Sequence, residues 1–388
     1  MKLLVVSYKS CWTSKSSPTA FATDGGFPLQ MNALSELFDE TRLALPLENR
    51  ASREGEVPIF GHNLSVIPLP APRGRGLKRK LFFPLWFLRS ARILWRESTR
   101  ADAVHAPIPG DVGTIGMLLA CLMGKPLLVR HCGNWFVQTT AAEHFWKWFM
   151  ERFAGGQRVM LATGGAKESP SRRNPNVYWI FSTSMNRCEL QAAAKRHKKT
   201  QPGARLIIAC RQEKEKGTGV VIQSLPLILR RFPHALLDVV GDGSALERFK
   251  QLAEALGVSD CVSFHGKLHH DAVIDLLKEA DVFCYPTTSS EGFPKAVLEA
   301  LAHGLPVVTT NVSVLPELIG RGCGRLIEQA GPAEVAEAVI EILSDRECFC
   351  QMSERAIDIA GQYSLEHWRD TIGELLRAAW DRPLRTHV

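Results

Sequence analysis

Residues 282–308 read VFCYPTTSSEGFPKAVLEALAHGLPVV, and this stretch contains a complete strand–loop–helix–strand unit. The apolar run at 282–285 is typical of a buried strand, and the polar loop after it reaches Pro294, a residue common in the first turn of a helix. The helix should end at Gly304, because glycine often terminates helices, and Pro306 should lead into the next strand. This order of elements predicts a parallel α/β sheet.

The same alternation continues on both sides of this unit. In the C-terminal half, further strands are predicted at 206–209, 236–240, 262–264 and 307–310. In the N-terminal half, strands are predicted at 3–6, 64–67, 103–105, 127–130, 159–162 and 177–181, with a helix over 30–40. Pro226 should kink or shorten the helix that precedes the strand at 236–240. Both halves are therefore expected to be doubly wound α/β domains.

A linker should join the two halves. Residues 195–203 are rich in charge, end in Pro202-Gly203 and show no apolar periodicity. A chain of 388 residues is also about twice as long as a typical domain. We therefore expect an N-terminal domain over 1–198 and a C-terminal domain over 199–363, followed by a helix within 364–388.

The composition is that of a globular protein, because 45% of the residues are hydrophobic and 22% are charged. The formal net charge of +7 does not by itself indicate a nucleic-acid partner. Ten cysteines are scattered without a C-x-x-C pair, which argues against a zinc or thioredoxin-type site and favours buried thiols in a reduced, cytoplasmic compartment. The apolar stretches at 1–6 and 115–123 are too short for a signal peptide or a membrane-spanning helix, respectively.

The loop that follows the strand at 282–285 is a candidate ligand site. The first N–H groups of the next helix should be free at the carboxyl edge of the sheet, where they can bind phosphate. Glu291 lies in this loop, and Glu299 lies about two turns into the helix. Because carboxylates repel phosphate, we expect them to bind the hydroxyl groups of a sugar or ribose. The alternative is a solvated loop residue and an ordinary residue of the helix surface.

The spacing of Glu291 and Glu299 resembles the E-x7-E motif of retaining glycosyltransferases of family 4. The resemblance covers about 206–327 and includes RQEKEKG at 211–217, VVGDG at 239–243 and FHGKL at 264–268. It implies the GT-B fold, in which two Rossmann-like domains face each other across a cleft and the C-terminal one holds a nucleotide-sugar donor. It also implies that the helix within 364–388 packs back onto the N-terminal domain.

The resemblance further implies roles for individual residues. Arg211 and Lys216 correspond to a basic pair on the donor diphosphate, and fixed cations suit a leaving nucleoside diphosphate. Glu291 would contact the donor sugar and Glu299 the ribose, while contacts near 266–268 would read the base. The implied donor site comprises Gly25, Gly26, Arg211, Lys216, Gly266, Leu268, Glu291, Gly292, Phe293, Pro294 and Glu299. The implied catalytic residues are His131, Glu291, Arg211 and Lys216.

The N-terminal half resembles the family less closely. Gly25-Gly26 follow the first strand and resemble a glycine loop beneath the diphosphate, although the arginine that often follows these glycines is missing; the alternative is a plain turn. His131 directly follows the strand at 127–130, at the position of the active-site histidine of the family; the alternative is a structural role, which explains His105 equally well. His269-His270 has no third ligand at a recognisable spacing, so a surface loop, and no metal ion or other cofactor, is expected.

Residues 71–100 carry nine Lys or Arg residues and one acid, Glu97, with aromatic and aliphatic residues among them. This composition suits the surface of an anionic membrane. The alternatives are a helix with a buried aromatic face and a solvated basic face, or a nucleic-acid site, although no nucleic-acid-binding motif is present. We expect the stretch 73–100 to place the protein at the inner face of the cell membrane.

Taken with the resemblance, these features predict a retaining, metal-independent glycosyltransferase. It would move a sugar from a UDP- or GDP-sugar to a carbohydrate, lipid-linked acceptor in the biosynthesis of cell-surface polysaccharide, lipopolysaccharide or glycolipid. The resemblance implies front-face substitution without an enzymic nucleophile. The alternatives are a GT-B-fold nucleotide-sugar epimerase and a non-catalytic subunit that binds a sugar nucleotide.

Overall fold

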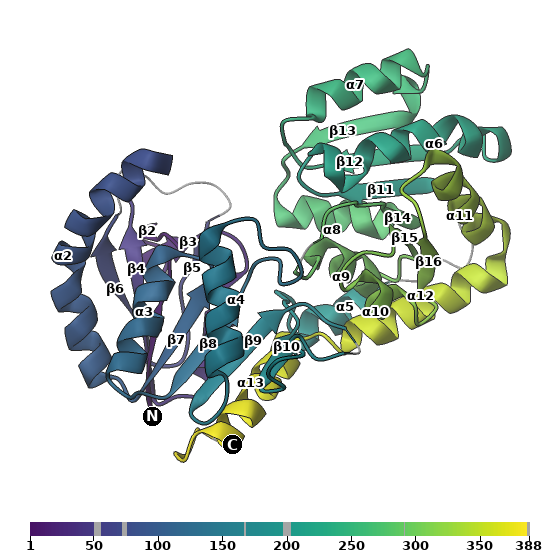
Figure 1. Ribbon diagram of the computed structural model, residues 1–388. Coiled ribbons are helices and arrows are strands. Elements are labelled where there is room, and N and C mark those ends of the chain that lie inside the picture. Colours follow the sequence, from purple (N-terminus) through teal and green to yellow (C-terminus); the bar gives the residue numbers. More distant parts are fainter. Residues whose placement is uncertain (50–55, 72–75, 167, 197–202, 291, 386–388) are drawn as a thin grey trace. The chain divides into compact units, whose positions relative to one another are not determined.

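The computed structural model describes residues 1–49, 56–71, 76–166, 168–196, 203–290 and 292–385. The chain divides into two compact units (Figure 1). Unit 1 comprises Met1–Gly164, Glu168–Ser184 and Leu365–Val388, and unit 2 comprises Gly165–Lys167 and Met185–Ser364.

The boundary at Ser184 lies before the one suggested by the sequence at 198. The reason is helix α5 (Arg187–Arg196), which packs against α9 (Lys295–Ala302) and α12 (Arg346–Gly361) of unit 2. The linker expected at 195–203 falls mainly on residues 197–202, which lie outside the described residues.

The main sheet of unit 1 is entirely parallel and has seven strands in the order β10-β9-β8-β7-β1-β4-β6. The strands are β1 (Lys2–Val6), β4 (Glu40–Leu47), β6 (Leu64–Pro70), β7 (Ala103–Ile108), β8 (Leu127–His131), β9 (Arg158–Thr163) and β10 (Val177–Ile180). A small antiparallel sheet, β2 (Trp12–Thr13), β3 (Phe21–Thr23) and β5 (Val57–Pro58), lies beside it. The near-continuous apolar strands are typical of a parallel sheet that is covered on both faces.

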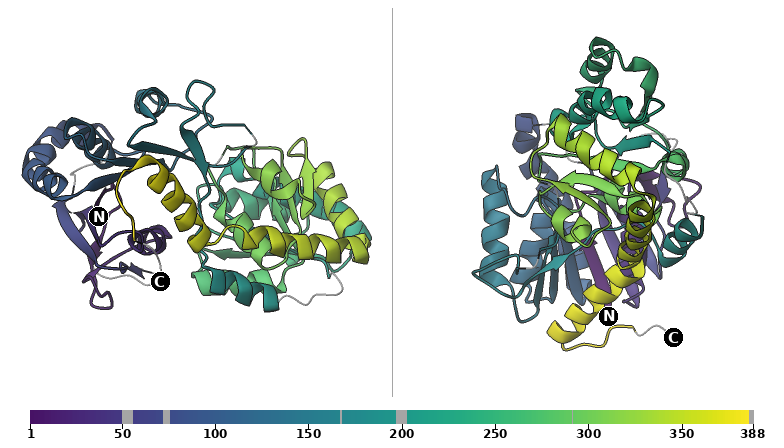
Figure 2. Two further views of the ribbon diagram at one scale, coloured as in Figure 1. Left: turned by 90° about the horizontal axis from the view of Figure 1, so that it is seen from below. Right: turned by 90° about the vertical axis from the view of Figure 1, so that its right-hand side faces the viewer.

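Two helical layers cover the main sheet of unit 1. Helices α2 (Gly76–Arg100), α3 (Asp111–Leu122) and α4 (Ala141–Phe153) share a core with Leu4 and Val6 of β1. Helix α13 (Leu365–Ala379) shares the opposite core with Leu3 and Val5, and it packs against α1 (Phe27–Ser35) and β9. Figure 2 shows α13, coloured yellow, from two further directions. Successive side chains of β1 thus supply both cores, as the alternation along a strand requires.

Unit 2 contains a six-stranded parallel sheet in the order β13-β12-β11-β14-β15-β16. The strands are β11 (Arg205–Ala209), β12 (Leu236–Val240), β13 (Val262–Gly266), β14 (Val282–Tyr285), β15 (Val307–Thr310) and β16 (Gly324–Ile327). The helices, besides α5, α9 and α12, are α6 (Thr218–Arg231), α7 (Leu246–Ala255), α8 (His270–Glu279), α10 (Leu315–Ile319) and α11 (Pro332–Ser344), with short 3-10 turns η1 (Lys214–Lys216) and η2 (Ser259–Cys261).

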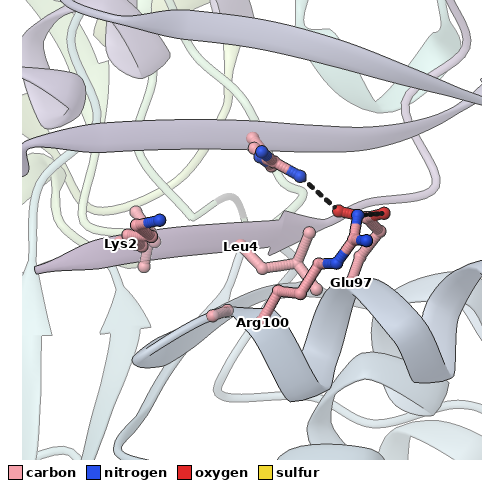
Figure 3. Close-up of a pocket in the computed structure, with 7 residues that line it drawn as sticks. Lys2, Leu4, Glu97 and Arg100 are labelled. Atoms are coloured by element: carbon pink, nitrogen blue, oxygen red, sulfur yellow. Dashed lines mark hydrogen bonds and ion pairs between the residues drawn. The ribbon is translucent and has the colours of Figure 1, made fainter.

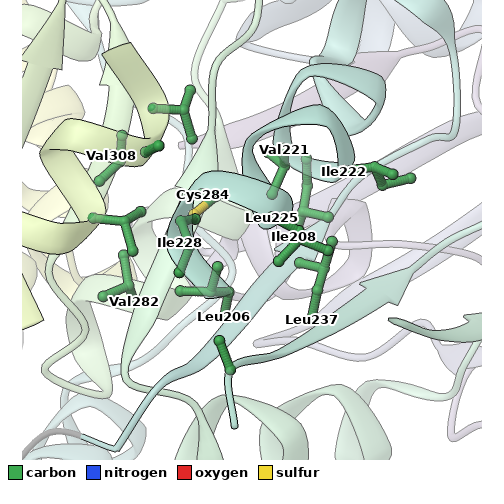
Figure 4. Packing of buried hydrophobic residues seen from close by; sticks show 14 of the residues in the cluster. Leu206, Ile208, Val221, Ile222, Leu225, Ile228, Leu237, Val282, Cys284 and Val308 are labelled. Carbon is green, nitrogen blue, oxygen red and sulfur yellow. The ribbon is translucent and has the colours of Figure 1, made fainter. Parts of the chain in front are cut away.

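The core of unit 2 shows why α6 continues past Pro226. Val221, Ile222 and Leu225 of α6 are fully buried against the sheet, as Figure 4 shows, and Ile228 extends this contact beyond the proline. This burial outweighs the cost of about 3 kcal/mol that an interior proline imposes on a helix. The prediction that Pro226 shortens the helix is therefore wrong, because α6 runs unbroken to Arg231.

The two doubly wound parallel sheets agree with the fold class expected from the sequence. Among the residues that the structure describes, none of the helices combines the length and the apolar character needed to cross a bilayer. Cys284 is fully buried as its apolar neighbours suggested, whereas Cys132 and Cys188 are exposed.

Candidate nucleotide-sugar site

The order of strands in unit 2 reverses between β11 and β14, which are hydrogen-bonded neighbours. In open α/β sheets, ligands bind outside the carboxyl ends of the strands at such a switch point. The loop after β11 and the loop after β14 meet here. Thr287 Oγ1 donates a 3.0 Å hydrogen bond to the Glu215 carbonyl, and the Thr288 backbone N–H donates one of 2.9 Å to the same oxygen.

Lys216 lies within these joined loops. Its side chain is only 7% exposed, and its Nζ donates a 3.0 Å hydrogen bond to Ser289 Oγ. A buried ammonium is costly unless it is matched by polar or charged groups. The sequence therefore places a fixed positive charge at the carboxyl ends of both switch-point strands. Arg211, the other member of the predicted pair, begins the same loop and is exposed.

Two helices begin at this switch point. Helix α6 follows Gly217 and α9 follows Pro294, and neither has a side-chain hydrogen bond at its N-cap. Gly217 adopts φ +91°, and a Cβ atom there would lie 2.4 Å from the Pro286 carbonyl oxygen. Only glycine lets the two loops approach this closely. The first N–H groups of both helices lack intrahelical partners, and N–H groups at such termini are suited to binding phosphate.

Gln212 is a residue of this region that the sequence analysis missed. Its fully buried side chain donates from Nε2 to the Val240 carbonyl at 2.9 Å and accepts from Thr218 Oγ1 at 2.7 Å. It thereby ties the end of β12 to the start of α6. The glycines of the VVGDG stretch were the available sequence signal for this close packing. A Cβ atom on Gly241 would lie 1.8 Å from the Cys210 carbonyl oxygen, and a Cβ atom on Gly243 would lie 2.4 Å from the Gln212 carbonyl oxygen.

Of the two predicted glutamates, Glu291 lies outside the described residues. Glu299 lies on α9 and is half-buried. Burial raises the pKa of its carboxyl group, and the positive charges of His270 and Lys295 oppose this only in part. Such a carboxyl group is suited to hydrogen bonding with neutral hydroxyl groups rather than with phosphate.

The remaining predicted donor residues of unit 2 lie in loops around the same edge of the sheet. Phe293 is buried, and its ring lies 5.5 Å from that of Tyr363. Pro294 is buried, whereas Gly292 and Leu268 are half-buried. Gly266 ends β13 with φ +64°, and its carbonyl accepts a 2.8 Å hydrogen bond from the Gly241 N–H. Of the predicted donor residues, Lys216 is held against the loop after β14, whereas the joint role of the others stays a prediction.

Gly25, Gly26 and His131 belong to unit 1. Gly25-Gly26 do not directly follow β1 as expected, because β2 and β3 intervene, and the pair leads from β3 into α1. Gly25 adopts φ +67° and has open space at its Cβ position, which is compatible with the plain turn as well as with a ligand.

His131 ends β8 and is 1% exposed. Neither ring nitrogen forms a hydrogen bond of good geometry among the described residues, and burial lowers its pKa to about 4, an effect that the nearby Gly133 backbone opposes in part. The ring of Trp135 meets it edge-on at 5.4 Å. An unpartnered buried imidazole needs an explanation, and one explanation is a ligand that supplies the missing bonds.

His105 is explained by its structural surroundings. Its Nδ1 lies 3.0 Å from the Leu128 carbonyl, and burial with the nearby Arg130 charge lowers its pKa to about 3. His269 and His270 are exposed. In the described part of the chain, no three His, Cys, Asp or Glu side chains gather to form a metal site.

Comparisons with known proteins agree with this geometry. Residues 191–360, all within unit 2, match the family model described as glycosyl transferases group 1. A D-inositol 3-phosphate glycosyltransferase of Corynebacterium urealyticum is 32% identical over 43% of this chain and 41% of its own length. A GDP-mannose-dependent alpha-(1-6)-phosphatidylinositol monomannoside mannosyltransferase of Mycobacterium tuberculosis is 34% identical over 40% and 43%, respectively. The matches therefore span about two-fifths of these relatives.

Over most of the chain, the sequence identity to known proteins is lower than in these shorter matches, but the structural similarity is clear. An alpha-D-kanosaminyltransferase of Streptomyces kanamyceticus is 24% identical over 83% of this chain and 89% of that protein. The crystal structure of Anabaena Alr3699/HepE in complex with UDP covers 97% of this chain and all of its own, with a TM-score of 0.71 at 17% identity. The structure of WaaG, a glycosyltransferase involved in lipopolysaccharide biosynthesis, has a TM-score of 0.57 at 16% identity, and the match covers 97% of this chain and 99% of that one. The predicted GT-B fold is thus confirmed.

Proposed function

We propose that the protein is a retaining glycosyltransferase that uses a nucleotide-sugar donor. The observation that carries this proposal is the switch point of unit 2, where Lys216 is fixed in joined loops between two uncapped helix N-termini. A nucleoside diphosphate carries the negative charge that this arrangement would neutralise. The match of residues 191–360 to glycosyl transferases group 1 supports the same reading.

The predicted donor residues would then contact different parts of the donor. Lys216 and Arg211 would hold the diphosphate, and Glu299 would accept hydrogen bonds from the ribose. Glu291 would contact the donor sugar, with the backbone at 292–294 beside it. The loop at 266–268 would contact the base of a UDP- or GDP-sugar; both nucleotides occur in the names of similar proteins.

The reaction would proceed by front-face substitution with retention at the anomeric carbon. A departing β-phosphate oxygen would take the proton of the acceptor hydroxyl as the sugar bond breaks, so no enzymic nucleophile is required. His131 would lie near the transferred sugar. The glutamates are assigned to donor binding. No metal ion or other cofactor is part of this proposal.

The acceptor is proposed to be a carbohydrate on a lipid carrier, reached at the inner face of the cell membrane. Helix α2 supports this proposal, because its described residues include four exposed arginines, Arg89, Arg92, Arg96 and Arg100. Exposed Leu88 and Trp95 lie among them. Cationic and aromatic side chains in this mixture suit an anionic lipid surface. The products would then be cell-surface polysaccharides or glycolipids.

Nucleotide binding to a Lys216→Met variant tests the donor site. A charge-assisted hydrogen bond contributes about 1.5–3 kcal/mol, so the variant should bind UDP or GDP roughly 10- to 100-fold more weakly than the wild type. Isothermal titration calorimetry gives the affinities, and circular dichroism checks the fold. Lys214→Met is a matched control, because Lys214 lies in the same turn but is exposed, and it should bind almost as the wild type does.

Unchanged nucleotide affinity in Lys216→Met, or no binding of UDP, GDP or ADP to the wild type, would contradict the proposed donor site. Product analysis then separates the alternatives. A transferase forms a new glycoside only when an acceptor is present, an epimerase converts the nucleotide sugar without one, and a non-catalytic subunit does neither.

A further inference from the structure

A groove in unit 1 lies between the N-terminal halves of α3 and α4, which Figure 1 shows over the sheet. It has a volume of about 660 Å³, and its apolar wall includes Tyr8, Pro109, Ile115, Leu118, Phe145 and Trp146. Pockets that bind small organic groups have volumes of about 300–1,000 Å³. The groove is therefore large enough for one such group.

The polar side chains along the groove are already used within the protein. Thr114 Oγ1 accepts a 2.7 Å hydrogen bond from Trp146 Nε1 and donates one of the same length to the Gly110 carbonyl. Glu143 accepts hydrogen bonds from the backbone N–H groups of Thr139 and Thr140 at the start of α4. The groove consequently offers apolar surface, which suits a hydrocarbon better than a sugar.

One end of the groove lies beside His131. A Cβ atom on Gly133 would lie 3.3 Å from His131 Cε1 and 3.5 Å from Cδ of Pro109, and Pro109 lines the groove. The buried imidazole with two unpartnered nitrogens and the apolar groove are therefore neighbours within unit 1.

The outer side of the same helical layer is apolar and basic. Leu118 and Phe145 of the groove are partly exposed, and Leu122 and Trp148 extend the apolar surface along α3 and α4. Helix α2 packs against α3 and adds its exposed arginines. These cations are complementary to the phosphate that links a sugar to a lipid carrier, whereas an apolar partner protein would leave them unmatched.

We propose that the groove between α3 and α4 binds the aliphatic chain of a lipid-linked acceptor. This inference rests on the proposed function and adds the site and the chemical class of the acceptor's apolar part. Leu118 lies in the groove wall and is exposed to solvent, so an entering aliphatic chain would contact it. In this proposal Leu118 therefore determines the specificity for an apolar chain.

A series of alkyl glucosides from methyl to octyl, kept below their micelle concentrations, tests the groove by isothermal titration calorimetry. Each methylene that enters the groove should raise affinity about fourfold, and the heat-capacity change should become more negative. Leu118→Gln should weaken octyl glucoside binding by about tenfold. Leu122→Gln, on the same helix but outside the groove lining, should bind as the wild type does.

Wild-type affinity that does not depend on chain length, or equal losses in the two variants, would overturn the proposal. A wild-type dimer that Leu118→Gln dissociates would also overturn it, since a second copy would then occupy the groove. UDP and GDP titrations of the same samples keep the two hypotheses apart. Intact nucleotide binding without chain-length dependence refutes the groove alone, and chain-length dependence without nucleotide binding refutes the donor site alone.

Discussion

His105 and His131 are both 1% exposed, and both have a buried ring nitrogen without a hydrogen bond of good geometry among the described residues, but only His105 has such a bond through its other nitrogen. His105 hydrogen-bonds to the Leu128 carbonyl through Nδ1, so its neutral form is fixed as the Nδ1–H tautomer. His131 has two unpartnered nitrogens beside the groove. A strand-end position alone could not separate these two roles, because the distinction lies in what each ring meets.

The low pKa of His105 predicts acid sensitivity of unit 1. Burial keeps this pKa at about 3, below the ordinary value of 6.5, so the folded state resists a proton that the unfolded state accepts. His105 therefore leaves the free energy of unfolding unchanged above about pH 6.5. As the pH falls from there towards 3, the free energy of unfolding decreases by about 1.4 kcal/mol per pH unit. In urea unfolding at pH 7.5 and pH 5, His105→Gln should therefore lose less stability than the wild type on acidification. Equal losses in both proteins would refute this assignment.

Lys216 entered the predicted donor site through the resemblance to a family motif, and its role there stays a prediction. Lys216 is next to Gly217, and the glycine spacing marks a close approach of loops. Gly241 and Gly243 marked a close approach of loops near Gln212, but the role of the Gln212 side chain follows only from the way the ends of β12 and α6 are brought together. The roles of Glu291 and Glu299 remain predictions, since they depend on a bound ligand.

At the scale of elements, the single acid of the basic stretch anchors its helix. Figure 3 shows Glu97 of α2 in a pocket with Lys2, Leu4 and Arg100. The carboxylate is buried and accepts a 2.7 Å hydrogen bond from Arg42 Nη1 of β4. Burial opposes its ionisation, but the hydrogen bonds from Arg42 and Arg96 outweigh this and lower the pKa of Glu97. The helix is thus joined to the sheet while Arg89, Arg92, Arg96 and Arg100 remain exposed.

Glu97→Gln should destabilise the protein by about 1.5–2 kcal/mol, because the variant weakens the charge-assisted hydrogen bonds from Arg42 and Arg96 while Arg42 keeps its ion pair with Glu40. Urea unfolding monitored by circular dichroism measures the loss. Glu247→Gln is the matched control, since Glu247 forms an exposed pair with Lys250 at 3.3 Å, and such pairs contribute less than about 1 kcal/mol. Losses of the same size in the two variants would contradict the anchoring role of Glu97.

The sequence predicted most strands of the two parallel sheets, but it missed β4 and β16 there and the three short strands β2, β3 and β5 of the antiparallel sheet. In β4 the polar Thr41 and Arg42 and the imino acid Pro46 interrupt the apolar pattern. In β16 the strand begins at Gly324, where a Cβ atom would lie 2.0 Å from the Val307 carbonyl, so a residue typical of turns is required inside a sheet. Both strands are specified by their neighbours in the sheet rather than by their own composition.

At the scale of the whole molecule, formal charge is unevenly placed. The chain has a net charge of +7, and the stretch 71–100 contains nine cations and one acid. Glu97, the single acid, is buried and forms ion pairs with Arg42 and with Arg96 and Arg100 of α2, while Arg89 and Arg92 are exposed. A cation near an anionic membrane surface contributes about 1 kcal/mol. Charge and exposed aromatic side chains therefore favour docking through the layer of α2, α3 and α4.

Vesicle flotation tests this docking with two charge-matched variants. Arg89→Glu/Arg92→Glu alters α2, and Arg230→Glu/Arg231→Glu alters an exposed helix end of unit 2 and changes the net charge by the same amount. The wild type and the unit 2 variant should float with vesicles that contain anionic lipid, whereas the α2 variant should remain in solution. Salt near 1 M should release the wild type, because the Debye length falls to about 3 Å. Equal flotation with neutral vesicles would mean that nonspecific adsorption, rather than this helical layer, brings the protein to lipid. Equal losses in the two variants would mean that the net charge of the protein determines its binding.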